Sequence, residues 1–191
     1  MQSQELKTEN YIQIQEKWWL EKFTPFIPKA KVLKIGNGLG HLSESIRHFA
    51  QELTIIDIET SPKTINKDHV QLYSGYPIPY HDKSFDTTVI VFTLHHTPQS
   101  SLYFKEILRV TSKRIILLEE TYSNVFQKMH LYFRDWLVNK KAGQSVDLYW
   151  NSYFSRKEIR KLIQESGLNI TYTFSKRHKT YFKELFVLEL N

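Results

Sequence analysis

The chain of 191 residues contains no cysteine. This absence excludes disulfide bonds, zinc sites built on thiolates and catalysis by a cysteine nucleophile. A protein without disulfides suits a reducing compartment, and we expect a cytoplasmic location.

Long apolar runs are also missing. No stretch approaches the ~20 consecutive apolar residues of a membrane-spanning helix, and the opening segment, MQSQELKTEN, lacks the apolar core of a signal peptide. We therefore expect no membrane partner. The net charge of +6 permits a polyanionic ligand, but the lysines are spread along the chain, so nucleic acid is a possible partner without being favoured.

Glycine is scarce, yet three of the six glycines stand at every second position of the segment KVLKIGNGLGH: Gly36, Gly38 and Gly40. An apolar segment of β character precedes them and a helical pattern follows. A strand, a glycine turn and a helix in this order form a nucleotide-binding unit, because glycine lets the backbone approach a ligand and the helix start offers unpaired N–H groups. His41 stands where the dinucleotide fingerprint has its last glycine. An ordinary tight turn between strand and helix is the alternative.

An acid follows the glycines at the spacing of a ribose-binding residue. Asp57 lies near the end of the second apolar run, 53–58, about twenty residues beyond the glycine turn. A carboxylate suits a ribose diol, because it accepts both of the hydrogen bonds that the two hydroxyls donate. Glu59 is the competing candidate, and a merely polar strand end is the alternative.

Segments of strand and helix character alternate along the chain. Strands are expected near 31–35, 53–58, 70–73, 87–92, 114–118 and 181–190, and helices over 9–24, after the glycines, around 102–108 and after residue 154. The strand 87–92 is β-branched up to its final phenylalanine, as is typical of the buried centre of a parallel sheet. This alternation predicts an α/β fold.

Four segments together resemble one protein family. The succession VLKIGNGLG, LTIIDIE, PIPYHDKSFDTTVIVFTLHHT and EILRV, over residues 30–120, is similar to the type 11 family of class I methyltransferases that depend on S-adenosyl-L-methionine (SAM). The resemblance implies a Rossmann-like fold with a mostly parallel seven-stranded sheet, helices on both faces and an antiparallel hairpin at the end of the chain. It also implies SAM as the cofactor.

The resemblance assigns cofactor contacts residue by residue. The glycines correspond to the loop at the methionine part of SAM, and Asp57 to the ribose-binding acid. The remaining contacts follow the second, third and fourth strands: Ile58, Ser74 and Gly75 near the adenine, and Phe92 and Leu94 at the methionine end.

Two of these positions depart from the family pattern. Lys34 replaces an acid that helps to hold the cationic end of SAM, and a lysine ~5 Å from a like charge costs about 3 kcal/mol at an effective dielectric of about 20. Lys34 could point to solvent, contact the SAM carboxylate or lose its proton. Ser74 replaces an acid that accepts from the adenine amino group. Both departures predict weakened SAM affinity, and a descendant that no longer uses the cofactor stays open.

Methyl transfer needs a general base only if the acceptor begins protonated. His95 and His96 are the candidate bases, because they follow the strand 87–92 at the edge where the methyl group is expected. Packing or capping of the next helix is the alternative role. His41 and His48 have no partner at ligand spacing, and no metal site is predicted.

Residues 121–153 are expected to cover the acceptor. Val125, Met129, Tyr132, Phe133, Trp136 and Leu137 are spaced for one helix face, and NKKAGQS is a turn. The candidate acceptor site combines residues of this segment with neighbours before it: Trp18, Glu119, Tyr122, Tyr132, Trp136 and Trp150, with Glu120, Tyr149 and Tyr153 close by. Tyrosine and tryptophan can form a cage for a planar or cationic acceptor. An aromatic cap on the sheet, or solvated acids, are the alternatives.

The predicted domain spans 1–191. It comprises a helical lid over 1–29, a SAM-binding core over 30–120, an aromatic insertion over 121–153, and a final helix and hairpin over 154–191. The predicted function is SAM-dependent methyl transfer to a small-molecule acceptor. A catalytically impaired methyltransferase-like binding protein and a tRNA methyltransferase are the alternatives. The basic tracts RKEIRK (156–161) and KRHK (176–179) are interpreted as an exposed helix face and a loop.

Overall fold

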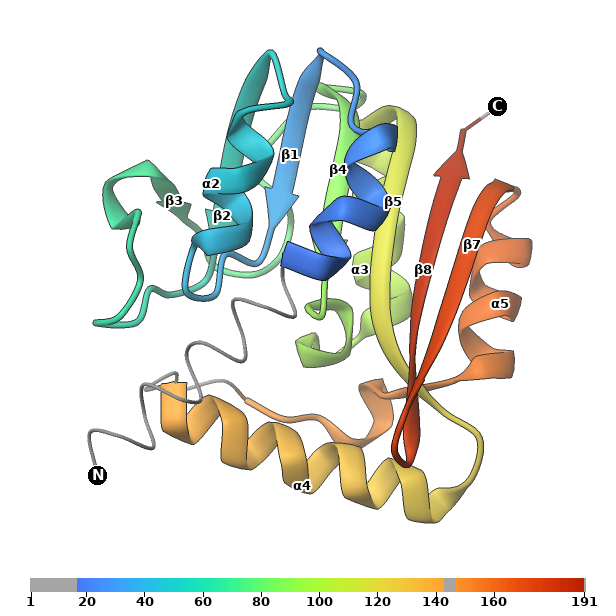
Figure 1. The fold of residues 1–191 in the computed structure, drawn as a ribbon. Coiled ribbons are helices and arrows are strands. Elements are labelled where there is room, and N and C mark those ends of the chain that lie inside the picture. Colours follow the sequence, from blue (N-terminus) through green and yellow to red (C-terminus); the bar gives the residue numbers. More distant parts are fainter. Residues whose placement is uncertain (1–16, 143–146, 191) are drawn as a thin grey trace.

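A computed structural model of the chain describes residues 17–142 and 147–190 (Figure 1). Its centre is a sheet in the order β3-β2-β1-β4-β5-β8-β7, with β6 paired to β5. The strands are β1 (Lys31–Ile35), β2 (Glu52–Asp57), β3 (Val70–Leu72), β4 (Phe85–Val91), β5 (Thr111–Tyr122), β6 (Phe154–Ser155), β7 (Asn169–His178) and β8 (Tyr181–Glu189). Only the pairs β5–β8 and β7–β8 are antiparallel. The predicted fold class is confirmed.

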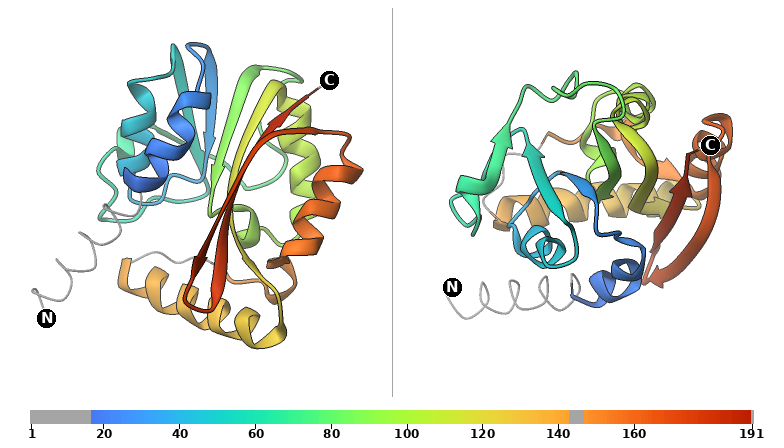
Figure 2. Two further views of the ribbon diagram at one scale, coloured as in Figure 1. Left: turned by 45° about the vertical axis from the view of Figure 1, so that its right-hand side comes forward. Right: turned by 90° about the horizontal axis from the view of Figure 1, so that it is seen from above.

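Helices cover both faces of this sheet and one of its edges (Figure 2). The α-helices are α2 (His41–Arg47), α3 (Ser100–Val110), α4 (Val125–Ala142) and α5 (Arg156–Glu165), and residues 17–23 form a further helical segment. Single turns of 3-10 helix occur at η1 (Thr24–Phe26), η2 (Lys67–His69), η3 (Leu94–His96) and η4 (Trp150–Ser152). The part of the predicted helix 9–24 that precedes Lys17 lies outside the described residues.

Alternation along the strands produces two cores. Leu33 and Ile35 of β1 join α3 and α5 in one apolar cluster, whereas Val32 joins α2 and Trp19 in the other. A central parallel strand is covered on both faces, and accordingly four of the five residues of β1 and five of the seven residues of β4 are buried. The helix predicted after the glycines is short: α2 ends at Arg47, and Phe49 beyond it is exposed.

β5 is much longer than the predicted strand 114–118. β8 pairs with it from Arg114 to Thr121, so the strand continues through Glu119 and Glu120. Both acids therefore lie within the sheet and are fully buried, which excludes the alternative that they are solvated.

The tract KRHK is not a loop, contrary to the prediction. Antiparallel pairing extends to His178 and Tyr181, so β7 contains its first three residues and only Lys179 lies in the turn. The other tract, RKEIRK, forms the start of α5, as expected, with Ser155 and Glu158 forming a capping box.

α4 lies across the carboxyl edge of the sheet, below the ends of β1, β4 and β5 in Figure 1. Four of the six residues predicted to share one helix face do so, and that face is exposed: Val125, Met129, Phe133 and Trp136. The opposite face buries Leu131 and Asp135, because their apolar and charged contacts hold α4 against the sheet. Within residues 17–142 and 147–190, no helix is long and apolar enough to cross a bilayer.

Candidate cofactor and acceptor site

The three glycines form a tight loop between β1 and α2. All three have positive φ, at 74°, 58° and 95° for Gly36, Gly38 and Gly40. A Cβ atom on Gly36 would lie 2.2 Å from Thr93 Oγ1, and one on Gly40 would lie 2.1 Å from Asn66 Oδ1. The loop therefore lies directly against the end of β4, and these positions exclude any larger residue.

Asparagine side chains hold the loop in place. Asn37 Nδ2 donates to Asn66 Oδ1 over 2.9 Å, and Ser43 Oγ donates to Asn37 Oδ1 over 2.7 Å. Asn66 Nδ2 in turn donates to Glu44 Oε1 of α2. No local sequence pattern indicates Asn37 and Asn66, because they are hydrogen-bonded to each other across 29 residues of the chain. The result is a loop whose backbone is fixed before any ligand arrives.

Asp57 is joined to this loop. Its Oδ2 accepts the backbone N–H groups of Asn37 at 2.6 Å and Gly38 at 3.4 Å, and its Oδ1 accepts that of Ile58 at 2.7 Å. Two features that the sequence placed about twenty residues apart thus meet at the carboxyl ends of β1 and β2. Each carboxylate oxygen can accept more than one hydrogen bond, so Asp57 retains capacity for a ligand hydroxyl.

The predicted adenine contacts are only partly brought together. A Cβ on Gly75 would lie 3.3 Å from Ile58 Cγ2, so these two residues are neighbours. Ser74 Oγ instead donates to the carbonyl of Tyr76 at 3.2 Å. The hydroxyl at position 74 is therefore turned toward its own chain.

Lys34 is buried, with an exposed fraction of 2%. Its ammonium donates to the carbonyl oxygens of Ile35, at 3.0 Å, and of Gly36. The option that Lys34 points to solvent is thereby excluded. The amino group of Lys34 therefore lies directly beside the glycine loop.

The segment after β4 is held against the neighbouring strand. The backbone of Phe92 has φ 49° and donates to the carbonyl of Leu118, and Lys183 Nζ lies 4.7 Å from the centre of the Phe92 ring. Leu94 is fully buried in the apolar core, so its side chain is part of the packing below the site. Thr93, which the sequence analysis did not select, contacts the loop instead.

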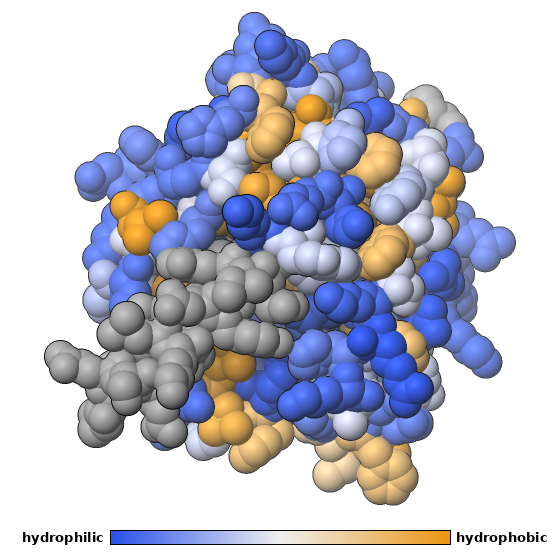
Figure 3. Space-filling model, viewed as in Figure 1, coloured by the Kyte–Doolittle hydropathy of each residue, from blue (hydrophilic) through white to orange (hydrophobic). Residues whose placement is uncertain are grey.

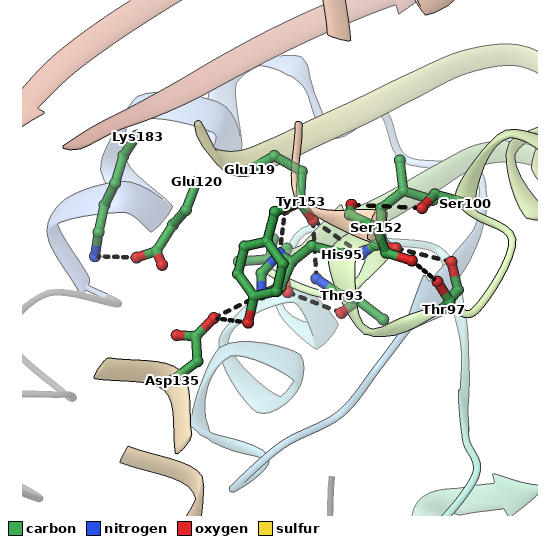
Figure 4. Close-up of polar contacts among 12 residues, drawn as sticks. Thr93, His95, Thr97, Ser100, Glu119, Glu120, Asp135, Ser152, Tyr153 and Lys183 are labelled. Atoms are coloured by element: carbon green, nitrogen blue, oxygen red, sulfur yellow. Dashed lines mark hydrogen bonds and ion pairs between the residues drawn. The ribbon is translucent and has the colours of Figure 1, made fainter. Parts of the chain in front are cut away.

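His95 is clamped between two carboxylates (Figure 4). Its Nδ1 lies 2.5 Å from Glu119 Oε2, and its Nε2 lies 3.3 Å from Asp135 Oδ2. Glu119 Oε1 also accepts the backbone N–H groups of Thr93, at 3.0 Å, and Leu94, at 2.9 Å. Burial opposes protonation of His95, but Glu119 and Asp135 raise its pKa well above the usual value. An imidazolium in this clamp has no free nitrogen with which to accept a proton.

His96 has the opposite electrostatic environment. Its ring centre lies 4.2 Å from that of His95, and burial together with the neighbouring imidazolium lowers its pKa to about 3. Nitrogen and oxygen atoms of His95, His96 and Asp135 lie within 4.8 Å of one another, a spacing that also suits a metal. The two ring nitrogens of His95 already pair with Glu119 and Asp135 when both are protonated. We therefore interpret the cluster as a contact that stabilises the fold.

The clamp continues into a balanced charge cluster. Arg134 lies 2.9 Å from Glu120, and Lys183 lies 3.5 Å from the same carboxylate. Tyr153 donates to Asp135 over 2.8 Å. Three carboxylates of Glu119, Glu120 and Asp135 thus face three cations of His95, Arg134 and Lys183. Together these contacts attach α4 to β5, β8 and η3.

The predicted aromatic cage is partly assembled. Tyr132 and Trp150 have ring centres 5.6 Å apart, and Lys128 Nζ lies 5.1 Å from the Tyr122 ring and 4.8 Å from the Trp150 ring. A cation of the protein itself therefore occupies the position expected for a cationic acceptor.

Two further residues of the predicted acceptor site lie elsewhere. Trp136 stacks on Phe133 at the exposed surface of α4. Trp18 packs against Phe174 of β7, with Lys176 Nζ 3.8 Å from its ring centre. These tryptophans are not brought together with Tyr132 and Trp150.

The His95 clamp makes stability depend on pH. Because the pKa of His95 is raised in the folded state, its contribution is fully present below the unfolded value of about 6.5 and is lost as the pH rises through the folded pKa. Asp135 has the opposite dependence, since its pKa is lowered despite burial and its contribution is lost only in acid. We expect the difference in unfolding free energy between the wild type and His95→Gln to be largest between about pH 4 and 6.5. Urea denaturation from about pH 4 to 9 measures it, and a difference that grows toward pH 9 would contradict the clamp.

Comparison with known proteins agrees with this geometry. Residues 13–173 match a family model described as "Methyltransferase domain". No curated protein sequence matches the chain.

Solved structures share the fold. A SAM-dependent methyltransferase from Methanosarcina mazei aligns with a TM-score of 0.60 and 21% identity, covering 84% of this chain and 92% of that one. Magnesium protoporphyrin IX methyltransferase from Synechocystis PCC 6803, with bound S-adenosylhomocysteine (SAH), aligns with a TM-score of 0.66 and 15% identity, covering 94% and 83%. A putative methyltransferase in a complex with the Trm112 activator, from Haloferax volcanii, aligns with a TM-score of 0.67 and 14% identity, covering 98% of this chain and 94% of that one.

The resemblance to class I SAM-dependent methyltransferases is confirmed, while the finer type 11 assignment stays a prediction. Because the family model spans most of the sequence and the glycine loop and Asp57 occupy the expected edge of the sheet, the chain belongs to the methyltransferase domain family.

Proposed function

We propose that the protein transfers a methyl group from SAM to a small-molecule acceptor. The proposal depends mainly on one contact: the backbone N–H of Asn37, in the glycine loop, donates a hydrogen bond to Asp57 Oδ2. In Rossmann-like folds this edge of the sheet is where a nucleoside binds.

The residues at this edge suit SAM. The backbone of Gly36 and Gly38 would approach the methionine part, Asp57 would accept from the ribose, and Ile58 with Gly75 would contact the adenine. A Cβ at Gly36 would clash with Thr93, so only glycine lets the loop pack this closely against the end of β4. SAM supplies a methyl group on a sulfonium, which is already a good leaving group.

The histidines supply no strong general base. Both nitrogens of His95 face carboxylates, and His96 stays neutral with its pKa at about 3. Catalysis would then rest on proximity and orientation, which can contribute roughly 7–11 kcal/mol. The acceptor would present a lone pair that is available without deprotonation by histidine.

The segment 121–153 would cover the acceptor, because α4 lies across the carboxyl edge of the sheet. A small molecule is favoured over tRNA by the pairing of the RKEIRK tract: Arg156 and Arg160 both contact the carboxylate of Glu184, at 3.3 Å and 2.8 Å. Glu184 thus offsets one of the two positive charges and holds both guanidinium groups against β8. The proposed lid over 1–29 falls largely outside the described residues.

Calorimetric titration with SAM tests the proposal. The wild type is expected to bind, and Asp57→Ala to bind about 10- to 100-fold more weakly, since a hydrogen bond to a charged group is worth about 1.5–3 kcal/mol. Asp82→Ala removes a surface acid that pairs with Arg109, and it should leave affinity unchanged. Equal affinity in wild type and Asp57→Ala would contradict the assigned ribose contact.

Lys34 favours one alternative, a methyltransferase-like protein that no longer catalyses. Its buried ammonium would repel the cationic end of SAM unless it pairs with the carboxylate. The variant Lys34→Gln distinguishes these two roles of the lysine. Tighter SAM binding by the variant indicates repulsion in the wild type, and weaker binding indicates a contact with the SAM carboxylate. Absence of SAM binding in both proteins would support the alternative.

A further inference from the structure

The helix α4 turns two charged residues and Leu131 toward the protein and five large apolar residues toward solvent. Arg134 and Asp135 face the sheet, where they meet Glu120 and His95. The outward face carries five large exposed apolar side chains, among them Phe126 with an exposed fraction of 78% and Phe133 with 59%: Val125, Phe126, Met129, Phe133 and Trp136. This is the reverse of an ordinary surface helix.

The apolar face is fixed outward by the charge cluster. Rotating α4 to bury Phe126 and Phe133 would separate Asp135 from His95 and Arg134 from Glu120, leaving buried charges unpaired. Figure 3 shows apolar side chains at the lower edge of the molecule, where α4 lies in Figure 1. A contiguous exposed apolar patch of this kind marks an interaction surface.

Basic residues surround this face. Asp135 is the only acid of α4 and is buried, whereas Lys140 and Lys141 are exposed at the carboxyl end. Lys140 Nζ lies 5.0 Å from the Trp136 ring centre. The β7–β8 hairpin adds Lys179 and Arg177, and it contacts α4 through the bond between Thr180 Oγ1 and His130 Nδ1. The turn of this hairpin, which contains Lys179, thus lies beside α4.

We propose, contrary to the expectation of no membrane partner, that the outward face of α4 docks on an anionic lipid surface. Aromatic and aliphatic side chains flanked by lysine and arginine are the composition of helices that lie in the plane of a membrane interface. With 18 residues, α4 extends over ~27 Å, and it lies along one side of the molecule, where a flat surface can reach its whole length (Figure 2). A second copy fits less well, because two such faces would oppose lysines without an acid to pair them. Lipid binding by this face is separate from the proposed function, because it does not require methyl transfer.

Flotation of the full-length protein with vesicles tests the proposal. Vesicles of phosphatidylcholine and phosphatidylglycerol in equal parts should carry the protein, and pure phosphatidylcholine vesicles should carry far less. Lys140→Glu should weaken binding at least ~5-fold, because each basic residue near an anionic surface contributes about that factor. The double variant Phe126→Glu/Phe133→Glu should lose at least ~10-fold, since its apolar anchors are removed.

The matched control is the double variant Leu72→Glu/Ile170→Glu, which adds the same two charges on exposed apolar residues of β3 and β7, outside α4. It should bind vesicles like the wild type, and circular dichroism should show that all variants are folded. Vesicle binding that is unchanged in the α4 double variant would overturn the proposal. A protein that ignores anionic vesicles but forms a dimer dispersed by the same double variant would also overturn it, in favour of a second copy.

Discussion

Glu119→Ala is expected to lower the free energy of unfolding by about 3–5 kcal/mol, the cost of breaking a buried ion pair from one side. Glu119 is fully buried and accepts from His95 Nδ1 and from the backbone N–H groups of Thr93 and Leu94. Without it, all three donors are buried without their acceptor. For a domain of this size we expect the melting temperature to fall by about 10 °C.

Two further variants make this result specific. Glu119→Gln keeps one oxygen as an acceptor and should recover part of the loss. Glu165→Ala removes an exposed acid that pairs with Lys161 on α5, and its effect should stay within about 0.5 kcal/mol. If Glu119→Ala lowers the free energy of unfolding as little as Glu165→Ala does, the clamp does not hold the end of β4.

Gly36→Ala is expected to reduce SAH affinity at least ~100-fold, because misplacement by about 1 Å at such a site has effects of this size. The added Cβ would lie 2.2 Å from Thr93 Oγ1, and φ of 74° is strained for any other residue. The loop must then move away from β4 and from Asp57. Calorimetric titration measures the affinity.

Gly167→Ala separates this steric effect from backbone strain. Gly167 also has a positive φ, of 69°, but its added Cβ would meet nothing within 4 Å. It should lose about 1–2 kcal/mol of stability and retain SAH affinity. Thr93→Ala should partly restore binding to Gly36→Ala, since it removes the nearest clashing atom. Unchanged affinity in Gly36→Ala would mean that the loop is not the cofactor site.

Local sequence patterns were sufficient to predict the nucleotide-binding half of the fold. The glycine spacing, the acid at the end of β2 and the β-branched run of β4 each depend on a few consecutive residues. Because parallel strands end at a common edge, their order placed Asp57 beside the loop, as the structure shows.

The clamp and α4 could not be predicted in this way, because their contacts join distant segments. His95 and Asp135 are 40 residues apart, and their pairing turns the apolar face of α4 toward solvent. One signal was present: β5 and β8 each carry two adjacent charged residues within apolar strands, Glu119 and Glu120 opposite Glu184 and Lys183. Such charges in apolar strands indicate buried ion pairs rather than strand tips.

The most direct test of the central claim is a thermal-shift titration of the wild type with SAM, SAH and, as a control, NAD. A ligand that binds only the folded state adds about 2.7 kcal/mol of stability at a hundredfold excess over its dissociation constant. The structure predicts a rise in melting temperature with SAM and SAH and none with NAD, because the loop lacks the third glycine of a dinucleotide site, where His41 stands. No rise at millimolar SAM and SAH would contradict the proposed cofactor site.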